Sequence, residues 1–311
     1  MTDTRPEPAD RLLFHLIWEG VLLLAVLVLL VVVLATGGRI GVLFLSVAAT
    51  GIVAFAFSLS VRAAVPNLAV VGAAAVGAAI AAQVGGVLGI VVSIVVLVVV
   101  GALVALAAVL LPVPTWAGTL VFGLALSAVA SLVLGNQSVQ VGSGGAGTTI
   151  AGVLFGLAAI GSIGVGVACA FWPVRRTLGQ YRSVGDGKRG LPALGVAAGA
   201  TVVSTVVAGI GGIIGAYYLG VAVPTSTPQL LWIIAAVLIG GASLRGRRVG
   251  VAGTFLGVML VACVSGLTAL AGLSSALTQL LLAVMAVVGL VVSWGADALG
   301  GGRTPPRTLA Q

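Results

Sequence analysis

Residues 87–111, VLGIVVSIVVLVVVGALVALAAVLL, contain no charged side chain over 25 positions. A helix needs about 20 predominantly apolar residues to cross the hydrocarbon layer of a membrane. The run lacks the ~10-residue alternation of a transmembrane β-strand. Because backbone groups in lipid must be hydrogen-bonded within their own segment, this stretch predicts a membrane-spanning α-helix.

Comparable stretches recur along the chain and predict an all-α, polytopic transmembrane helix bundle of about ten spans. The predicted spans cover residues 15–36, 40–60, 66–84, 87–111, 115–135, 149–172, 192–219, 230–243, 250–271 and 275–296. Gly, Pro and Asn clusters separate most of them. The segment 230–243 is too short for a comfortable crossing and suggests a broken or half-length helix. No internal repeat is evident.

The composition agrees with this class of fold. Of the 311 residues, 60% are hydrophobic and only 6% are charged, whereas soluble domains carry about 25% charged residues. We expect a cytoplasmic tail over 1–14, a transmembrane domain over 15–298 and a second cytoplasmic tail over 299–311. The first apolar run exceeds the core of a signal peptide, so we expect it to remain as a span.

The basic residues predict the orientation. If the N-terminus is cytoplasmic and ten helices cross, thirteen of the fourteen basic residues fall on the cytoplasmic side and only Arg39 falls outside. This distribution is what the positive-inside rule expects. The net charge of +8 is therefore expected to reflect topology, and no nucleic acid is expected as a partner.

The sequence lacks the residues that ATP hydrolysis and zinc chemistry require. The single lysine, Lys188, is followed by Arg189, so the chain has no P-loop for binding ATP. With His15 as the only histidine, neither an H-E-x-x-H motif nor an ordinary four-ligand zinc site can form. Cys169 and Cys263 lie within apolar runs and are expected to pack as small hydrophobes. We predict no enzyme activity, no metal and no cofactor.

The acidic residues predict no proton relay. Of the six, Glu19 lies near the cytoplasmic end of the first span, Asp297 lies just past the last, and none is placed at mid-membrane. Proton-driven carriers usually need a buried titratable group. One explanation is that a separate protein supplies the energy for transport. The basic loop 173–191 could be the contact site for that protein, or it could simply set the topology. Sodium coupling through carbonyl and hydroxyl groups stays open.

The 47 glycines have an expected role in packing, because close backbone approach favours helix association in lipid. Three pairs place two glycines on one helix face: Gly152/Gly156, Gly211/Gly215 and Gly253/Gly257. Packing within the chain is favoured over a homodimer contact.

Residues 235–257, AAVLIGGASLRGRRVGVAGTFLG, resemble the penultimate region of permease subunits in ribose-type and branched-chain amino acid-type ABC importers. The residues that carry the resemblance are Gly240, Gly241, Ser243, Leu244, Gly246, Gly250, Gly253, Thr254 and Gly257. Residues 152–156 and 67–72 resemble other family segments more loosely, with Asn67 in place of an aspartate. The cytoplasmic loop is shorter than the family's coupling helix and lacks its alanine pair.

The resemblance implies a permease subunit in a prokaryotic plasma membrane. Its partners would be cytoplasmic ABC ATPase subunits, an extracytoplasmic solute-binding protein and a second permease chain. Candidates for coupling to the ATPase are Arg182, Gly185, Asp186, Lys188 and Arg189. Polar side chains at membrane depth give the candidates for the solute path: Asn67, Ser131, Thr201 and Ser204.

Each path candidate has a structural alternative. Serine and threonine within a span often bond their own helix carbonyls, and Asn67 could cap a helix at Pro66. The scarcity of charge favours a neutral, polar solute such as a sugar or nucleoside. The rival functions are a stand-alone secondary carrier, which should show inverted halves with matched broken helices, and a membrane scaffold without transport.

Overall fold

The computed structural model describes residues 12–111, 113–141, 148–178, 191–224, 227–242 and 251–300. The helices of the first half are α1 (Leu12–Ala35), α2 (Ile40–Arg62), α3 (Val70–Val84), α4 (Gly86–Leu110) and α5 (Thr115–Val133). Those of the second half are α6 (Thr148–Ala170), α7 (Trp172–Leu178), α9 (Leu191–Leu219), α10 (Thr227–Ile239), α11 (Gly253–Leu270) and α12 (Ser275–Gly300).

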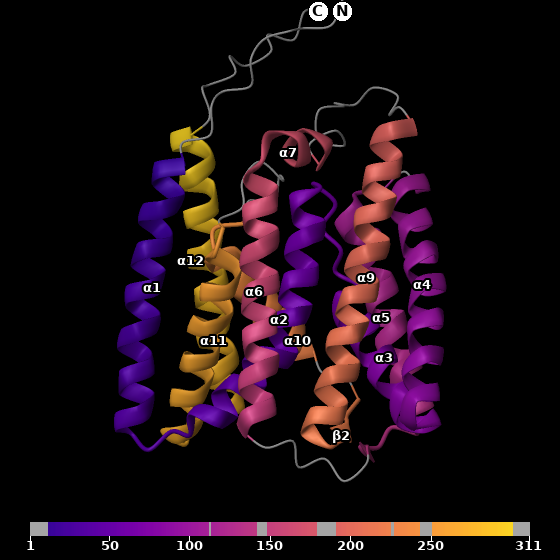
Figure 1. Ribbon diagram of the computed structural model, residues 1–311, viewed down its shortest axis with the longest axis horizontal. Coiled ribbons are helices and arrows are strands. Elements are labelled where there is room, and N and C mark those ends of the chain that lie inside the picture. Colours follow the sequence, from indigo (N-terminus) through magenta and orange to yellow (C-terminus); the bar gives the residue numbers. More distant parts are fainter. Residues whose placement is uncertain are drawn as a thin grey trace, which may run out of the picture.

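The chain is a multi-pass membrane protein with an all-α fold. Within the described residues, eight helices are long and apolar enough to span a membrane, and α3 and α10 are shorter apolar helices. These ten elements correspond to the ten predicted segments. The remaining helix, α7, lies across one end of the bundle (Figure 1).

Most predicted boundaries differ from the structure by a few residues, and two of the differences have an identifiable cause. The span predicted from residue 66 begins at Val70, because residues 63–69 form a turn around Pro66, and proline constrains both itself and the residue before it. The segment predicted over 230–243 is α10, which has 13 residues. It ends before Gly241, whose φ of +82° a glycine adopts at little cost.

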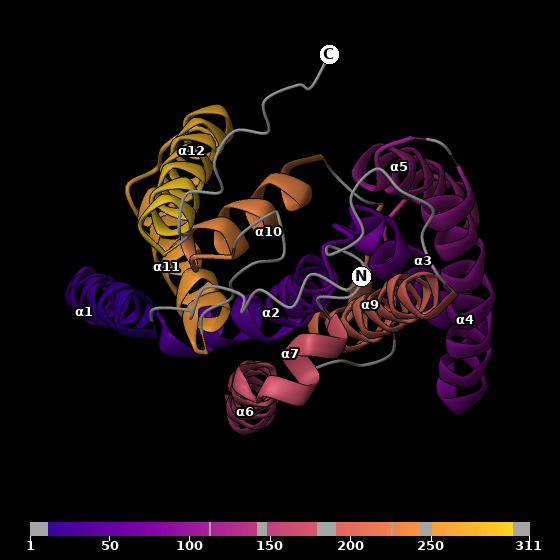
Figure 2. The same cartoon turned by 90° about the horizontal axis from the view of Figure 1, so that it is seen from above.

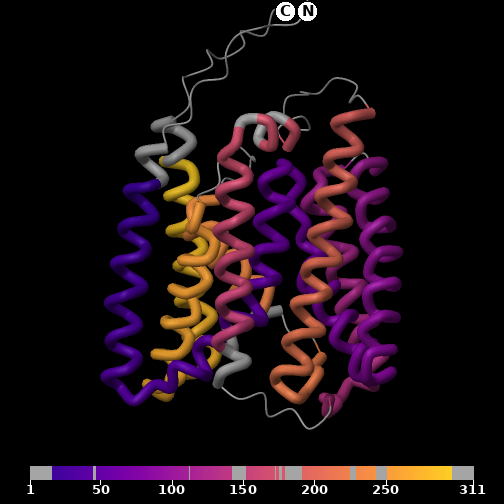
Figure 3. Tube along the Cα trace, viewed as in Figure 1, coloured from indigo at the N-terminus to yellow at the C-terminus, as the bar shows by residue number. Residues whose placement is uncertain are grey.

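The bundle has two distinct ends. At one, which we call the α7 end, α1 begins, α2 and α6 end and α12 finishes (Figure 1). At the other, which we call the β end, strands β1 (Val139–Gln140) and β2 (Val221–Ala222) pair antiparallel, with Val139 opposite Ala222. Figure 3 shows the first helix (indigo) and the last helix (yellow) on the same side of the bundle, where α1 packs on α11.

The helix order of α2–α5 recurs in α9–α12. Each series is a long helix, a short helix and two further helices, and the chain direction of matched helices is opposite. The connections before the short helices span residues 63–69 and 220–226, seven residues each, and those before the last helices span 111–114 and 271–274, four residues each.

Packing repeats the same relationship. The short helix α3 packs on α4, α5 and α9, and the short helix α10 packs on α11, α12 and α2. Seen from above, α3–α5 and α10–α12 form two groups on either side of α2 and α9 (Figure 2). In helix order, direction and packing the two series are related as an inverted repeat, with α2 and α9 in contact at its centre. The connection after the short helix differs between them, with Gly85 alone in the first series and residues 240–252 in the second.

Glycines bring the central helices together. A Cβ atom on Gly77 of α3 would lie 2.7 Å from the carbonyl oxygen of Gly209 on α9, and one on Gly212 would overlap the carbonyl group of Ala74. Only a residue without a Cβ atom permits such backbone contacts, as expected for helices that associate in lipid. The predicted pair Gly211/Gly215 also packs within the chain, against Ile52 and Ala49 of α2.

Candidate functional site

A small cavity of about 140 Å³ lies where the two short helices meet the two central ones. Its walls come from α2, α3, α9 and α10, together with the residues around β2. Its lining residues include Thr50, Val53, Ala74, Ala78, Gly211, Gly215, Gln229 and Ile233. In transporters built from inverted repeats, solute sites lie at the repeat interface beside discontinuous helices. This central cavity occupies that position.

The lining of the central cavity is small and uncharged. Alanine, glycine and valine dominate it, and its polar side chains are those of Thr50 and Gln229. A site without a charged group has no counter-ion for an ionic solute, because an unpaired charge in a low-dielectric interior is costly. The cavity therefore suits a small uncharged solute.

A buried polar cluster surrounds the turn between α2 and α3. The side-chain amide of Asn67 donates to the hydroxyls of Ser204 (2.7 Å) and Thr205 (3.0 Å) and to the carbonyl of Thr201 (3.4 Å). Its Oδ1 accepts from the backbone N–H of Ala69 at 3.1 Å. Asn67 and its three α9 partners, Thr201, Ser204 and Thr205, are fully buried, so the turn is anchored to the middle of α9.

The hydroxyls of α9 can accept from Asn67 because their own protons are used elsewhere. Thr201 donates to the carbonyl of Ala197, and both Ser204 and Thr205 donate to the carbonyl of Thr201. The lone pairs of the Ser204 and Thr205 hydroxyls then face the Asn67 amide. The arrangement fixes the orientation of the amide and explains why an amide, with its two N–H donors, suits this position.

Two further helices hold the same turn. The Ser60 hydroxyl of α2 accepts from the backbone N–H of Asn67 at 3.0 Å. The Thr119 hydroxyl of α5 accepts from the N–H of Leu68 at 3.1 Å and donates to the carbonyl of Pro66 at 3.0 Å. The non-helical backbone is thus satisfied by side chains from α2, α5 and α9, as irregular segments at membrane depth require.

The turn contains a strained residue. Ala64 has a φ of +58°, in the left-handed region that costs an L-residue roughly 1–2 kcal/mol. It follows Ala63, the C-cap residue of α2, and the next N–H, of Val65, donates to the carbonyl of Ser60 at 3.0 Å. This is the bonding pattern of a Schellman motif, in which glycine usually occupies the position of Ala64.

A second discontinuity separates α10 from α11, and α1 contacts both of its sides. The indole N–H of Trp18 donates to the carbonyl of Ile239, at the end of α10, at 2.8 Å. The neighbouring Glu19 accepts from the backbone N–H of Ala252, just before α11, at 3.2 Å. A carboxylate at a helix N-terminus is favourable because the helix dipole is positive there.

Close backbone packing accompanies this discontinuity. A Cβ atom on Gly240 would lie 2.5 Å from the carbonyl oxygen of Gly253, and one on Gly257 would overlap the carbonyl group of Ala236. Gly241 faces the Trp18 ring. Thr254 is buried. These family-motif residues thus form the crossing of α10 and α11, whereas Ser243, Gly246 and Gly250 lie outside the described residues.

The predicted path residues fall into two groups. The structure brings Asn67, Thr201 and Ser204 into one cluster, although Asn67 is 137 positions from Ser204 in the chain. Ser131 is separate from them and donates to the carbonyl of Ser127 on its own helix, α5, at 3.1 Å. A role for any of the four in a solute path stays a prediction. The coupling candidates Arg182, Gly185, Asp186, Lys188 and Arg189 lie outside the described residues.

Several contributors were not among the predicted site residues. Thr205, Ser60 and Thr119 complete the Asn67 cluster, and Trp18 and Glu19 join α1 to α10 and α11. The spacing of Thr201, Ser204 and Thr205 places all three on one helix face, which is a signal in the sequence. Nothing in the sequence indicates that Trp18 and Glu19 contact residues more than 200 positions away.

In the parts of the chain that the structure describes, no group of three or more His, Cys, Asp or Glu side chains could hold a metal ion. Comparisons of the chain with models of known protein families, with curated proteins and with solved structures find no match. The resemblance to ABC importer permeases therefore remains a prediction from the residues that carry it.

Proposed function

We propose that this chain is a permease subunit of an ATP-binding cassette importer for a small, uncharged polar solute of the sugar or nucleoside kind. The observation that carries the proposal is the central cavity, which lies at the interface of an inverted repeat and between its two short helices. An inverted repeat provides two related arrangements of helices around one site, which alternating access requires.

The placement of the described charged side chains supports external coupling. Among the described residues, the charged side chains within the spans are Glu19 and Arg62, and neither lines the central cavity. In this proposal, cytoplasmic ATPase subunits bias the equilibrium between the two arrangements. A solute-binding protein delivers the solute from the other side, and a second permease chain completes the complex.

A stand-alone secondary carrier is the second candidate, and the inverted repeat is the observation that favours it. Matched short helices in the two halves are typical of ion-coupled carriers. Such a carrier would need no ATPase, so the two functions differ in which proteins remain attached to the chain.

The test is an affinity purification of the tagged full-length chain from mild detergent, with mass spectrometry of the proteins that accompany it. We expect a P-loop ATPase at about one copy per permease. The double substitution Asp186→Ala/Lys188→Ala should release it while leaving membrane insertion intact. The double substitution Arg5→Ala/Arg11→Ala changes charges in the N-terminal tail and is the matched control, which should retain the ATPase.

Two outcomes would contradict the importer. Recovery of the chain alone, under conditions that preserve a known ABC complex, would favour the secondary carrier. Solute uptake by proteoliposomes that contain only this purified chain and an ion gradient would lead to the same conclusion.

A further inference from the structure

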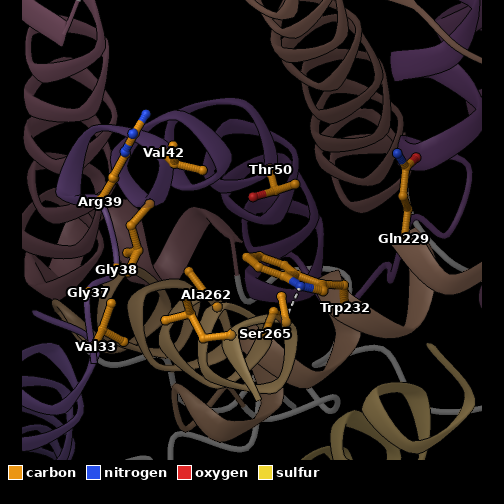
Figure 4. A pocket seen from close by; sticks show the side chains of 14 residues that line it. Val33, Gly37, Gly38, Arg39, Val42, Thr50, Gln229, Trp232, Ala262 and Ser265 are labelled. Atoms are coloured by element: carbon orange, nitrogen blue, oxygen red, sulfur yellow. Dashed lines mark hydrogen bonds between the residues drawn. The ribbon is translucent and has the colours of Figure 1, made fainter. Parts of the chain in front are cut away.

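A second, larger cavity lies toward the β end, between α1, α2, α10 and α11. Its volume is about 710 Å³, within the range of about 300–1,000 Å³ that is typical of small-molecule sites. Figure 4 shows its walls, which include Val33, Gly38, Arg39, Val42, Thr50, Gln229, Trp232, Ala262 and Ser265. We call it the lateral cavity.

The depth of the lateral cavity matches one leaflet of a bilayer. Its outer rim is formed by the α1–α2 turn at Gly37–Arg39 and by Leu270, the last residue of α11. Its inner wall includes Ala262 of the same helix, which at 1.5 Å per residue lies about 12 Å deeper. The hydrocarbon core of a membrane is about 30 Å thick, so the cavity extends through most of one leaflet.

Apart from Arg39, and from Thr50 and Gln229, which also line the central cavity, the polar side chains of the lining bond to each other. The indole N–H of Trp232 donates to the Ser265 hydroxyl at 3.0 Å, and Figure 4 shows this pair at the cavity wall. Around the rim, Val42 and Leu270 are 61% and 49% exposed. Exposed apolar side chains beside the opening indicate that the cavity faces hydrocarbon.

Among the described residues that line the lateral cavity, Arg39 is the only charged one. It is exposed and follows the α1–α2 turn, and its guanidinium projects away from the apolar side chains (Figure 4). A largely apolar cavity with a cation at the membrane interface is complementary to an amphiphile with an anionic head. Arginine binds phosphate oxygens through paired N–H donors.

We propose that the lateral cavity is a binding site for an anionic phospholipid. One acyl chain occupies the space beside Trp232 and Ala262, and the phosphate pairs with Arg39. Within the described part of the lining, the ammonium group of a zwitterionic lipid finds no acidic partner, so an anionic headgroup is preferred. This inference does not depend on the proposed transport function.

Native mass spectrometry of the full-length protein tests the site. The protein is equilibrated in mixed micelles containing equal amounts of phosphatidylglycerol and phosphatidylcholine, and the retained lipid is counted. Wild type should retain one lipid with a several-fold preference for phosphatidylglycerol. Arg39→Gln should remove most of that preference and leave a lipid bound.

A cavity-filling variant tests the position. A Cβ atom on Gly266, which lines the cavity, has no neighbour within 4 Å, so Gly266→Leu extends into open space. It should abolish retention of both lipids. Gly161 of α6 has the same free surroundings but is not part of the lining, and Gly161→Leu is the matched control. Monodisperse elution of each variant verifies that it is folded.

Three results would overturn the proposal. The first is a folded Gly266→Leu variant that retains as much lipid as wild type. The second is an unchanged lipid preference in Arg39→Gln. The third is a dimer mass that disappears in Gly266→Leu, which would show that a second copy of the chain occupies the lateral cavity.

Discussion

Asn67 uses both ends of its side-chain amide inside the bundle. Asn67→Ala removes the partner of the Ser204 and Thr205 lone pairs and of the Ala69 N–H. Leaving buried polar groups unsatisfied costs about 1–3 kcal/mol, so the variant should unfold at lower temperature in detergent. A thermal melt of the purified protein measures the shift.

Ser131→Ala is the matched control for this experiment. The Ser131 hydroxyl bonds only to its own helix among the described contacts, so its loss should change the free energy of unfolding by no more than about 0.5 kcal/mol. If Asn67→Ala is as stable as wild type but no longer transports, Asn67 lines the solute path and does not anchor the turn.

A substitution at Ala64 is expected to stabilise the protein, in contrast to Asn67→Ala. Its φ of +58° is strained for alanine but not for glycine. Ala64→Gly should therefore raise the free energy of unfolding by about 1 kcal/mol, measured by the same melt. Ala63, its neighbour, has a φ of −81°, and Ala63→Gly should be neutral or destabilising. Equal effects of the two substitutions would show that the turn carries no such strain.

At the scale of elements, the crossing of α10 and α11 depends on glycine. A Cβ atom on Gly253 would overlap the carbonyl group of Gly240, and both sides of this contact are backbone. Gly253→Ala must therefore separate the two helices, and overpacking typically costs about 1–3 kcal/mol. We expect a lower melting temperature and a looser contact with Trp18 of α1.

Gly161→Ala is the corresponding control on α6. Space around Gly161 is open, and alanine favours a helix by up to about 1 kcal/mol over glycine. This variant should be as stable as wild type or more so. A Gly253→Ala protein with an unchanged melting temperature would show that α10 and α11 can separate without loss.

The predicted pair Gly152/Gly156 differs from the other two glycine pairs. Cβ atoms at these positions on α6 would meet nothing within 4 Å among the described residues. Packing within the chain was the favoured prediction for all three pairs, and it is confirmed for Gly211/Gly215 and Gly253/Gly257 only. Spacing identifies a small-residue face of a helix, but the neighbour of that face depends on tertiary structure.

Much of the element order could be predicted because length and hydropathy alone identify membrane-spanning helices. The start of α3 was harder to predict. Apart from Asn67, residues 63–69 are apolar, yet Ser60, Thr119 and the α9 hydroxyls hold them outside a helix. The cluster itself joins residues 134 to 138 positions apart, a relationship that no local pattern contains.

At the scale of the whole molecule, the series α2–α5 and α9–α12 match in helix order and packing but not in sequence. The matched short helices α3 and α10 have 15 and 13 residues. The connections before them have equal lengths, whereas α3 is followed by Gly85 alone and α10 by residues 240–252. Their side chains also differ. Hydrophobic residues can replace one another in lipid-facing positions without changing the fold. Sequence similarity between the halves can therefore vanish while the helix arrangement persists.

The orientation of the bundle gives the last prediction. Of the four basic residues that the structure describes, Arg62, Arg175 and Arg176 lie at the α7 end and Arg39 lies at the β end. The positive-inside rule therefore places the α7 end in the cytoplasm. In a variant without Cys169 and Cys263, a membrane-impermeant maleimide should label Thr36→Cys in intact cells and Thr177→Cys only after permeabilisation.

The labelling sites are matched, because Thr36 and Thr177 are both exposed and lie at opposite ends of the bundle, and the cysteine-free parent gives the background. The reverse pattern would put α7 outside and exclude it as a contact for a cytoplasmic ATPase. Labelling of both sites in intact cells would indicate two orientations in one membrane. The expected pattern puts the lateral cavity in the outer leaflet and α7 on the side where ATP is available.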